Sequence, residues 1–324
     1  MNVSKRAVLT LATGKPLYFN MAVNLARSFM LWHQGSSIDF FIATDIEMSL
    51  PKDLERVKLI KLLPGQYGKG FSPKLSLDRI SPAEETLFID ADCLCAANLE
   101  PVFQKFAACE VSVIGSEDSE GELFGDIAAR CRAVGVKWVP RFCGGMYYFK
   151  RGEISDQIFQ TARELEERYD ELGLARLRGV PNEEPLIGLA MAMAGQHPIP
   201  EDGTIKAEPM FFTGHTELDV FAGRARLFNL AGKPPLSPQW KTPNEARPVV
   251  IHFNCSFAEQ PPYTSESLRL EKHFRDGWAL PLATVYSWVK CTVPYRVSKA
   301  FKNSLRPLLH LVWGNRAVKP SARI

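Results

Sequence analysis

Two aspartates, Asp90 and Asp92, follow directly after the apolar run Thr86-Leu87-Phe88-Ile89. In an extended chain, residues i and i+2 point to the same side, so this spacing would place both carboxylates together beyond the end of a buried strand. Carboxylate oxygens suit Mg²⁺ or Mn²⁺, and such a cation can neutralise a diphosphate. The spacing therefore favours a metal-dependent enzyme that acts on a nucleotide diphosphate, against the alternative of two solvated acids at a strand end.

Two segments earlier in the chain have residue types that suit the same ligand. The first strand-like run passes through Thr10 and ends in the small residues Ala12 and Thr13, which let a base and ribose approach the backbone closely. Lys74 lies shortly before the aspartates, and we expect it to open a short helix there. Either feature alone is a weak signal.

Two segments later in the chain complete the set. Gly144 and Gly145 follow Cys143 and precede an apolar strand, and His252 ends a strand late in the chain. A neutral imidazole near two carboxylates is a common set of metal ligands, so His252 is a candidate third ligand. The alternative is a histidine packed in the core.

The apolar pattern predicts alternating strands and helices, which indicates an α/β fold with a mainly parallel sheet. In such sheets, ligands bind beyond the carboxyl ends of the strands, where the two aspartates are expected. The predicted helices cover 19–34, 154–172 and 182–194, and the predicted strands cover 6–12, 38–43, 57–63, 86–90, 110–115, 145–150 and 248–253.

In this order, the motifs resemble those of GT-A fold glycosyltransferases, and most closely glycosyltransferase family 8, over residues 5–255. The resemblance implies a Rossmann-like sheet flanked by helices. It also implies that Asp90-Ala91-Asp92 binds Mn²⁺ and the donor diphosphate, that Lys74 helps to hold the donor, and that His252 is a further metal ligand. Cys143-Gly144-Gly145 would line the sugar pocket, with a change from the family pattern at Cys143.

The resemblance extends to a helix start, Asn182-Glu183-Glu184, where the family has Asp-Gln-Asp/Glu. It implies retention of anomeric configuration, with Glu183 or Glu184 beside the anomeric centre; alternatively, both acids only charge a helix N-terminus. The expected reaction is transfer of a hexose from a nucleotide-diphosphate sugar, such as a UDP-sugar, to a glycan or lipid-linked acceptor. The sequence departs from the family after His252, where the usual glycine and phosphate-binding lysine are absent.

Three other functions compete with this interpretation. Phosphatases of the haloacid dehalogenase type place an Asp-x-Asp on their first strand, whereas here it falls on about the fourth. A nucleotidyltransferase needs a glycine-rich, basic signature after the first strand, of which Gly14-Lys15-Pro16 is only a fragment. A nucleotide-sugar-binding or membrane-scaffold protein without turnover is the non-enzymatic alternative.

Composition is consistent with one globular catalytic unit. The 324 residues are 46% hydrophobic, and no apolar run is long enough to cross a bilayer. The N-terminal segment lacks the layout of a signal peptide, so we expect a cytoplasmic protein, and we expect its seven cysteines to be reduced thiols. No feature indicates nucleic-acid binding.

Charge divides the chain into two expected parts, a catalytic domain at 1–276 and a helical, basic, aromatic tail at 277–324. Residues 1–276 carry a net charge of about −5, whereas the tail carries +8 and no acid. Basic and aromatic residues together suit an anionic membrane surface, so the tail is predicted to dock on the inner face of a membrane. The alternative is a helix packed on the catalytic domain. The eight bases of the tail are Lys290, Arg296, Lys299, Lys302, Arg306, Arg316, Lys319 and Arg323.

Overall fold

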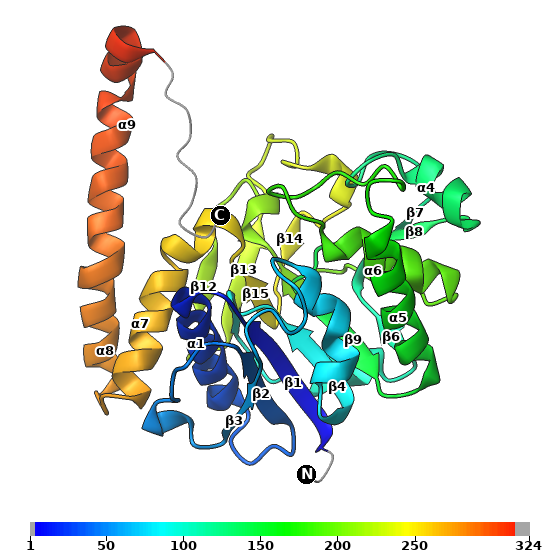
Figure 1. Ribbon diagram of the computed structural model, residues 1–324. Helices are drawn as coiled ribbons and strands as arrows, with labels where there is room; N and C mark the ends of the chain where they lie inside the picture. Colours follow the sequence, from blue (N-terminus) through cyan, green and yellow to red (C-terminus); the bar gives the residue numbers. More distant parts are fainter. Residues whose placement is uncertain (1–3, 315–324) are drawn as a thin grey trace.

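The computed structural model describes residues 4–314 (Figure 1). A six-stranded sheet forms its centre, made of β1 (Ser4–Ala12), β2 (Asp39–Thr44), β3 (Val57–Lys61), β4 (Ala83–Ile89), β6 (Val111–Ser112) and β9 (Met146–Lys150). The strand order is β3-β2-β1-β4-β9-β6. Strands β1 to β4 are parallel, and β9 runs antiparallel to both β4 and β6. The predicted α/β class with a mainly parallel sheet is confirmed.

Apolar side chains cover both faces of this sheet, as parallel strands require. In β1, Val8 belongs to the core on one face and Leu9 to the core on the other. The first core includes α1 (Pro16–Trp32), which begins with a proline at its first turn, and α3 (Glu100–Phe106). The second core includes α4 (Ile127–Val134), α5 (Glu153–Glu167) and α6 (Glu183–Met193).

Three small sheets surround the central one. The first contains β5 (Cys93–Cys95), β11 (Lys206–Ala207) and β15 (Val250–His252), the second β7 (Ile114–Asp118), β8 (Val139–Phe142) and β10 (Ile199–Pro200), and the third β12 (Glu217–Asp219), β13 (Arg224–Phe228) and β14 (Glu245–Ala246).

The prediction of one strand over 110–115 was wrong, because the chain changes sheet there. Residues 111–112 pair with β9, whereas Ile114 pairs with Ile199 of β10. Between them, the carbonyl of Val113 accepts the amide of Ile199 at 2.9 Å. Both halves are apolar, so the sequence pattern alone does not reveal the break. The strand predicted at 248–253 is also shorter, and it belongs to a small sheet.

The described part of the chain ends in helices, in agreement with the helical C-terminal extension that was predicted. These are α7 (Tyr263–Phe274), α8 (Leu280–Ser287), a π-helical turn over Trp288–Thr292 and α9 (Val293–Trp313), which follow one side of the molecule in Figure 1. Ala283 and Ser287 of α8 are buried, and α8 packs on α7. None of the helices within 4–314 is long and apolar enough to cross a membrane. The division at residue 276 stays a prediction, and Arg316, Lys319 and Arg323 lie outside the described residues.

Candidate metal and donor site

The two aspartates lie in a tight turn that connects β4 to β5. Strand β4 ends at Ile89, and the amide of Cys93 donates to the carbonyl of Asp90 at 3.1 Å. The expectation of an extended Asp-x-Asp was therefore wrong in its geometry, because a turn brings the residues together at the carboxyl end of the strand. Asp92 is buried, whereas the Asp90 side chain is 22% exposed.

Strand pairing brings His252 to these aspartates. In the antiparallel pair of β15 and β5, His252 lies opposite Cys93, and the amide of Phe253 donates to the carbonyl of Asp92 at 3.0 Å. The Nε2 atom of His252 is 3.2 Å from Oδ1 of Asp92 and 3.7 Å from Oδ2 of Asp90. The structure thus brings together all three predicted ligands.

Asp92 and His252 belong to a group of side chains whose ligand atoms all lie within 4.8 Å of one another and could hold a divalent cation such as Mn²⁺ or Mg²⁺, and Asp90 borders this group. Burial alone would lower the pKa of His252, but the charge of Asp92 outweighs it and raises that pKa well above its ordinary value. Asp92 and the protonated His252 thus form a pair of opposite charges inside the protein. The Cys93 sulfur also lies within 4.8 Å of the Asp92 and His252 ligand atoms, although burial raises the pKa of this thiol well above its usual range.

Lys74 connects the aspartates to the start of α6. It lies inside a 3-10 helix over Ser72–Ser76, which begins two residues earlier than expected. Its Nζ is 2.9 Å from Oδ2 of Asp90, 2.9 Å from the carbonyl of Gly144 and 2.8 Å from Oε1 of Glu183. Burial would lower the pKa of Lys74, but Asp90 and Glu183 together raise it above its ordinary value.

Glu183 and Glu184 form the first turn of α6 and have contacts beyond the helix. Glu183 is buried beside the Tyr147 hydroxyl at 3.2 Å, and its Oε2 has no hydrogen-bond partner among the described residues. Glu184 is half-buried and accepts the amide of Gly144 at 2.6 Å. Burial and the neighbouring Glu183 raise the pKa of Glu184 to about 7.

Both glycines of the predicted sugar-pocket motif are required by close packing. A Cβ at Gly144 would lie 2.7 Å from Oε1 of Glu183, and a Cβ at Gly145 would lie 2.4 Å from Nδ1 of His252. The carbonyl of Gly145 also accepts the amide of Asp90 at 3.0 Å. Beside them, the Cys143 sulfur lies 3.6 Å from His252 Nδ1. This segment is therefore the surface on which the imidazole rests.

The predicted nucleotide-contacting residues of β1 lie at the same edge of the sheet. Leu9 pairs with Phe88, so the end of β1 lies next to the end of β4 that carries Asp90. The side chains of Thr10 and Ala12 are fully buried, Thr13 is half-exposed, and Ala91 is buried in the aspartate turn. Because these exposures are for whole residues, Thr10 and Ala12 are closed to a ligand in this structure, and only Thr13 of the predicted β1 contacts is accessible.

A buried ion pair behind His252 was not anticipated from the sequence. Lys206 and Glu208 pair with each other, and Oε1 of Glu208 lies 3.5 Å from His252 Nδ1. Burial would raise the pKa of Glu208, but Lys206 and His252 lower it to about 2. Lys206 and Glu208 have opposite charges at positions i and i+2, a pattern that is typical of the solvent-exposed face of a strand. Only apolar neighbours such as Ile205 and Phe211 indicate that the pair is buried.

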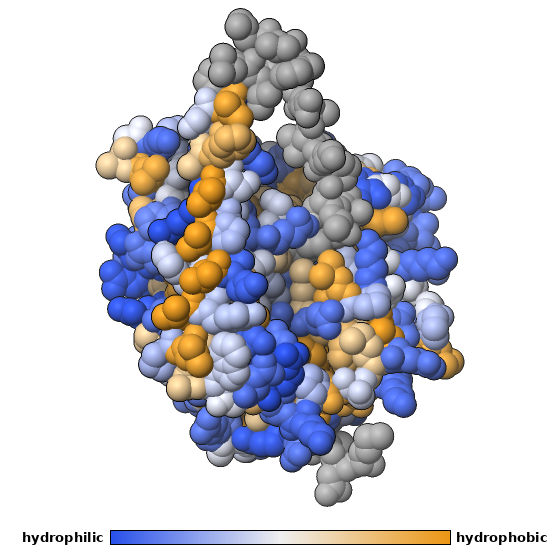
Figure 2. Space-filling model, turned by 90° about the vertical axis from the view of Figure 1, so that its left-hand side faces the viewer, coloured by the Kyte–Doolittle hydropathy of each residue, from blue (hydrophilic) through white to orange (hydrophobic). Residues whose placement is uncertain are grey.

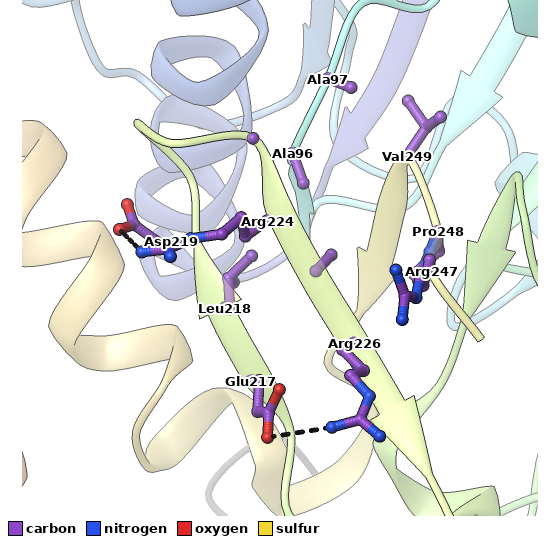
Figure 3. Close-up of a pocket in the computed structure, with 12 residues that line it drawn as sticks. Ala96, Ala97, Glu217, Leu218, Asp219, Arg224, Arg226, Arg247, Pro248 and Val249 are labelled. Carbon is purple, nitrogen blue, oxygen red and sulfur yellow. Dashed lines mark hydrogen bonds and ion pairs between the residues drawn. The ribbon is translucent and has the colours of Figure 1, made fainter. Parts of the chain in front are cut away.

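A cavity of about 480 Å³ lies away from this site (Figure 3). Strands β12 and β13 form one wall, Ala96, Ala97 and the segment 247–249 form the rest, and none of the predicted site residues lines it. Its charged side chains are paired, Arg224 with Asp219 at 3.1 Å and Arg226 with Glu217 at 3.6 Å.

No protein-family model and no curated protein matches this sequence. Among solved structures, the galactosyltransferase LgtC, solved with donor and acceptor sugar analogues, matches at 13% identity over 63% of this chain and 76% of its own, with a TM-score of 0.44. GlyE of Streptococcus pneumoniae TIGR4 matches at 16% identity, with coverages of 62% and 46% and a TM-score of 0.41. The bifunctional WbbM matches at 10%, with coverages of 78% and 46% and a TM-score of 0.46. All three are glycosyltransferases, the class that the sequence motifs resemble.

Proposed function

We propose that this chain is a metal-dependent glycosyltransferase that transfers a hexose from a nucleotide-diphosphate sugar, such as a UDP-sugar, to a glycan or lipid-linked acceptor. One observation carries the proposal: Oδ1 of Asp92 and Oδ2 of Asp90 lie 3.2 Å and 3.7 Å from Nε2 of His252, at the carboxyl end of β4. Ligands of α/β sheets bind at such strand ends. The cation would be Mn²⁺ or Mg²⁺.

Each part of the site has a role in this reaction. A bound cation supplies positive charge that stabilises a departing diphosphate. Asp90, Asp92 and His252 would hold it, and the Lys74 ammonium, next to Asp90, adds a second positive charge on the donor side. Since these groups stabilise the leaving group without donating a proton, the protein needs chiefly to position an acceptor hydroxyl.

The start of α6 would face the transferred sugar. Glu184 is the more open of its two acids, and the amide of Gly144 holds its carboxyl group. Glu183 instead anchors Lys74 from a buried position. We propose that Glu184 lies beside the anomeric centre, with retention of configuration, and that Glu183 has a positioning role through Lys74.

A nucleotide-sugar-binding protein without turnover is the second candidate. It is favoured by the segment after His252, which forms a 3-10 helix over Cys255–Glu259 and contains neither the glycine nor the lysine of the family motif. With fewer positive side chains next to the diphosphate, the protein would stabilise the leaving group less, which slows transfer without preventing binding of the nucleotide sugar.

The test is a panel of nucleotide sugars measured by thermal shift with and without Mn²⁺, since a ligand that binds only the folded state raises the melting temperature. We expect a shift that needs both a nucleotide diphosphate and the metal. No shift with any nucleotide sugar in Mn²⁺ contradicts the proposal. Hydrolysis or transfer of an isotope-labelled donor then separates a transferase from a binding protein.

We further propose that the C-terminal helices dock the enzyme on an anionic membrane. Figure 2 shows an apolar stripe, bordered by polar side chains, along this face of the molecule. The described part of the tail has five exposed bases and no acid. Basic and apolar residues on one helix are the combination that binds anionic lipid. The exposed apolar residues of this segment are Leu282, Val285, Trp288, Val289, Val297 and Phe301.

A further inference from the structure

A second cavity, of about 350 Å³, opens between β7, β10 and the 3-10 helix at Pro238–Trp240. Strand β8, which pairs with β7, packs against α6, the helix that carries Glu183 and Glu184 (Figure 1). The cavity wall contains one indole ring and three charged side chains, those of Glu117, Glu201 and Lys241. Nothing in the donor site described above uses these residues.

Packing fixes the indole ring of Trp240 in this wall. Its ring lies 4.8 Å from that of Phe211, with an angle of 31° between their planes, and the Arg141 guanidinium lies 5.9 Å from its centroid. The next residue, Lys241, pairs with Asp118 of β7 at 2.7 Å. This ion pair connects the segment that contains Trp240 to strand β7 on the opposite wall of the cavity, so both walls are held in place by contacts.

Glu201 connects the cavity to the predicted metal site. Its half-buried carboxyl group interacts with the charges of Lys206 and Glu208. Lys206 also reaches the carbonyl of Cys143 at 3.4 Å, and Glu208 lies 3.5 Å from His252. The side chains of Lys206 and Glu208 would therefore separate a ligand in the cavity from His252.

The chemistry of the wall matches an uncharged sugar. A pyranose ring has an apolar C–H face that packs on an indole and a rim of hydroxyls that needs paired donors and acceptors. Burial and the neighbouring Glu208 raise the pKa of Glu201 to about 8, so at neutral pH this carboxyl is mostly protonated and can both donate and accept. Glu117 pairs with His197 at 2.6 Å and Lys241 with Asp118 at 2.7 Å, but a carboxylate has further acceptor positions and an ammonium has further donor positions for sugar hydroxyls.

We propose that this cavity binds a remote part of the acceptor, a sugar ring of a neutral oligosaccharide that lies on Trp240 with hydroxyls on Glu201 and Glu117, while the reacting end of the oligosaccharide extends to the donor site. The role of the cavity in acceptor binding rests on the proposed transferase function. Sugar binding by the cavity can nevertheless be measured without donor or metal. The acceptor is thereby assigned to the side of the site formed by β7 and residues 198–241.

The experiment uses the full chain and four disaccharides, lactose, cellobiose, maltose and diacetylchitobiose, in saturation-transfer NMR without nucleotide or metal. We expect at least one to bind, and Trp240→Ala to weaken it by about 10-fold, which corresponds to loss of one stacked ring. Trp278→Ala is the matched control, since that indole also packs on an aromatic ring and a lysine, Tyr286 and Lys272, but lies outside the cavity.

A second measurement tests the proposal even if the Trp240→Ala variant does not fold. Binding to the unmodified protein should change its tryptophan fluorescence, and Trp240→Phe, which keeps a ring, should remove most of that change. Binding of none of the four disaccharides, or equal binding by the unmodified protein and a folded Trp240→Ala variant, overturns the proposal. Because nucleotide-sugar binding in Mn²⁺ is measured separately, failure of the acceptor subsite and failure of the donor site are distinguished.

Discussion

The two aspartates of the turn have different environments, and this difference predicts different roles. Asp92 is buried against His252, whereas Asp90 is more open and is shared between His252 and Lys74. A cation at this place would displace the proton of His252 and compete with Lys74 for Asp90. Asp92 is therefore the residue whose charge the cation most depends on.

Asp92→Asn should abolish Mn²⁺-dependent binding of a nucleotide diphosphate, because it removes a buried carboxylate ligand at nearly constant volume. The measurement is a Mn²⁺ titration in the presence of UDP, with the melting temperature as a check of folding. Asp170→Asn, at an exposed acid that pairs only with Arg176 in the described contacts, is the control. Undiminished Mn²⁺-dependent binding in a folded Asp92→Asn protein would exclude this site.

The Lys206–Glu208 pair should orient His252, since a carboxylate at Nδ1 directs Nε2 toward the aspartates. Glu208→Leu should lower Mn²⁺ affinity by about 10-fold to 100-fold. It should also cost about 3–5 kcal/mol of stability, because it removes the hydrogen-bonded partner of the buried Lys206 charge.

The double variant Lys206→Met with Glu208→Leu separates these effects. An apolar pair should recover most of the stability but not the Mn²⁺ affinity, because His252 still lacks its partner. If the double variant recovered both, the pair would be structural only. The two measurements are a denaturant melt and a metal titration.

Glu201 and Glu184 should make the protein less stable as the pH rises from about 5 to 8. Burial raises the pKa of Glu201 to about 8 and that of Glu184 to about 7, with Glu208 and Glu183 adding to the shifts. In this window the unfolded chain has already lost these protons, since an exposed glutamate has a pKa of about 4.3. The folded state then binds more protons, so the free energy of unfolding falls with pH.

Glu201→Gln, which cannot ionise, should flatten this decrease. The measurement is the melting temperature at several pH values, for both proteins in the same buffers. Glu117→Gln, at a more exposed acid of the same cavity, is the control, and an equal decrease in the Glu201→Gln protein would contradict the prediction.

At the scale of elements, the site depends on how β15 pairs with β5. Opposite Cys93, His252 rests on Gly145, and β4 ends where the carbonyl of Gly145 accepts the amide of Asp90. A shift of β15 by one residue would turn His252 to the other face of its sheet. The register and the glycine therefore act together to place the imidazole.

Gly145→Ala should lower both stability and Mn²⁺ affinity, because its Cβ would overlap the His252 ring. Overpacking of this kind costs about 1–3 kcal/mol. Gly152→Ala is the matched control, since a Cβ there meets nothing within 4 Å and its φ of 162° is extended backbone. Normal metal affinity in Gly145→Ala would mean that His252 is not a ligand.

At the scale of the whole molecule, charge is divided between a catalytic portion at about −5 and a tail at +8. Only the tail is expected to approach an anionic surface, because the catalytic portion would be repelled from it. The face of α8 that packs on α7 includes Ala283 and Ser287, and the apolar residues that face solvent remain for lipid. Substitutions on α9 therefore test docking better than a truncation, which would uncover α7.

Replacing Lys299, Lys302 and Arg306 by glutamine should weaken binding to anionic vesicles by about 100-fold, since each base near the surface contributes about 1 kcal/mol. Val297→Ser with Phe301→Ser should reduce the part of binding that survives high salt, because these side chains are 63% and 64% exposed. Leu63→Ser, at a 73% exposed residue in a loop, is the control. The measurement is sedimentation with vesicles of increasing anionic content, and binding that is equal in all four proteins would mean that the tail does not dock there.

The sequence by itself determined the strands β1 to β4 and β9 of the central sheet and the positions of the acidic residues. Apolar runs such as 6–12 and 86–90 predict strands buried on both faces, because burial requires a continuous apolar pattern that is written locally. The same pattern gave the helix that starts at Glu183 and the strand ends at Asp90 and His252. The resemblance to glycosyltransferases added the candidate partners of these residues.

Only the tertiary structure decided which of these residues meet. The turn at Asp90–Asp92, the pairing of His252 with Cys93 and the buried Lys206–Glu208 pair depend on contacts between segments far apart in the chain. The cavity at Trp240 arises in the same way, because its walls come from separate parts of the chain. Local patterns report whether a residue is buried in a strand or helix, but the register between distant strands is fixed by packing, which a single sequence does not display.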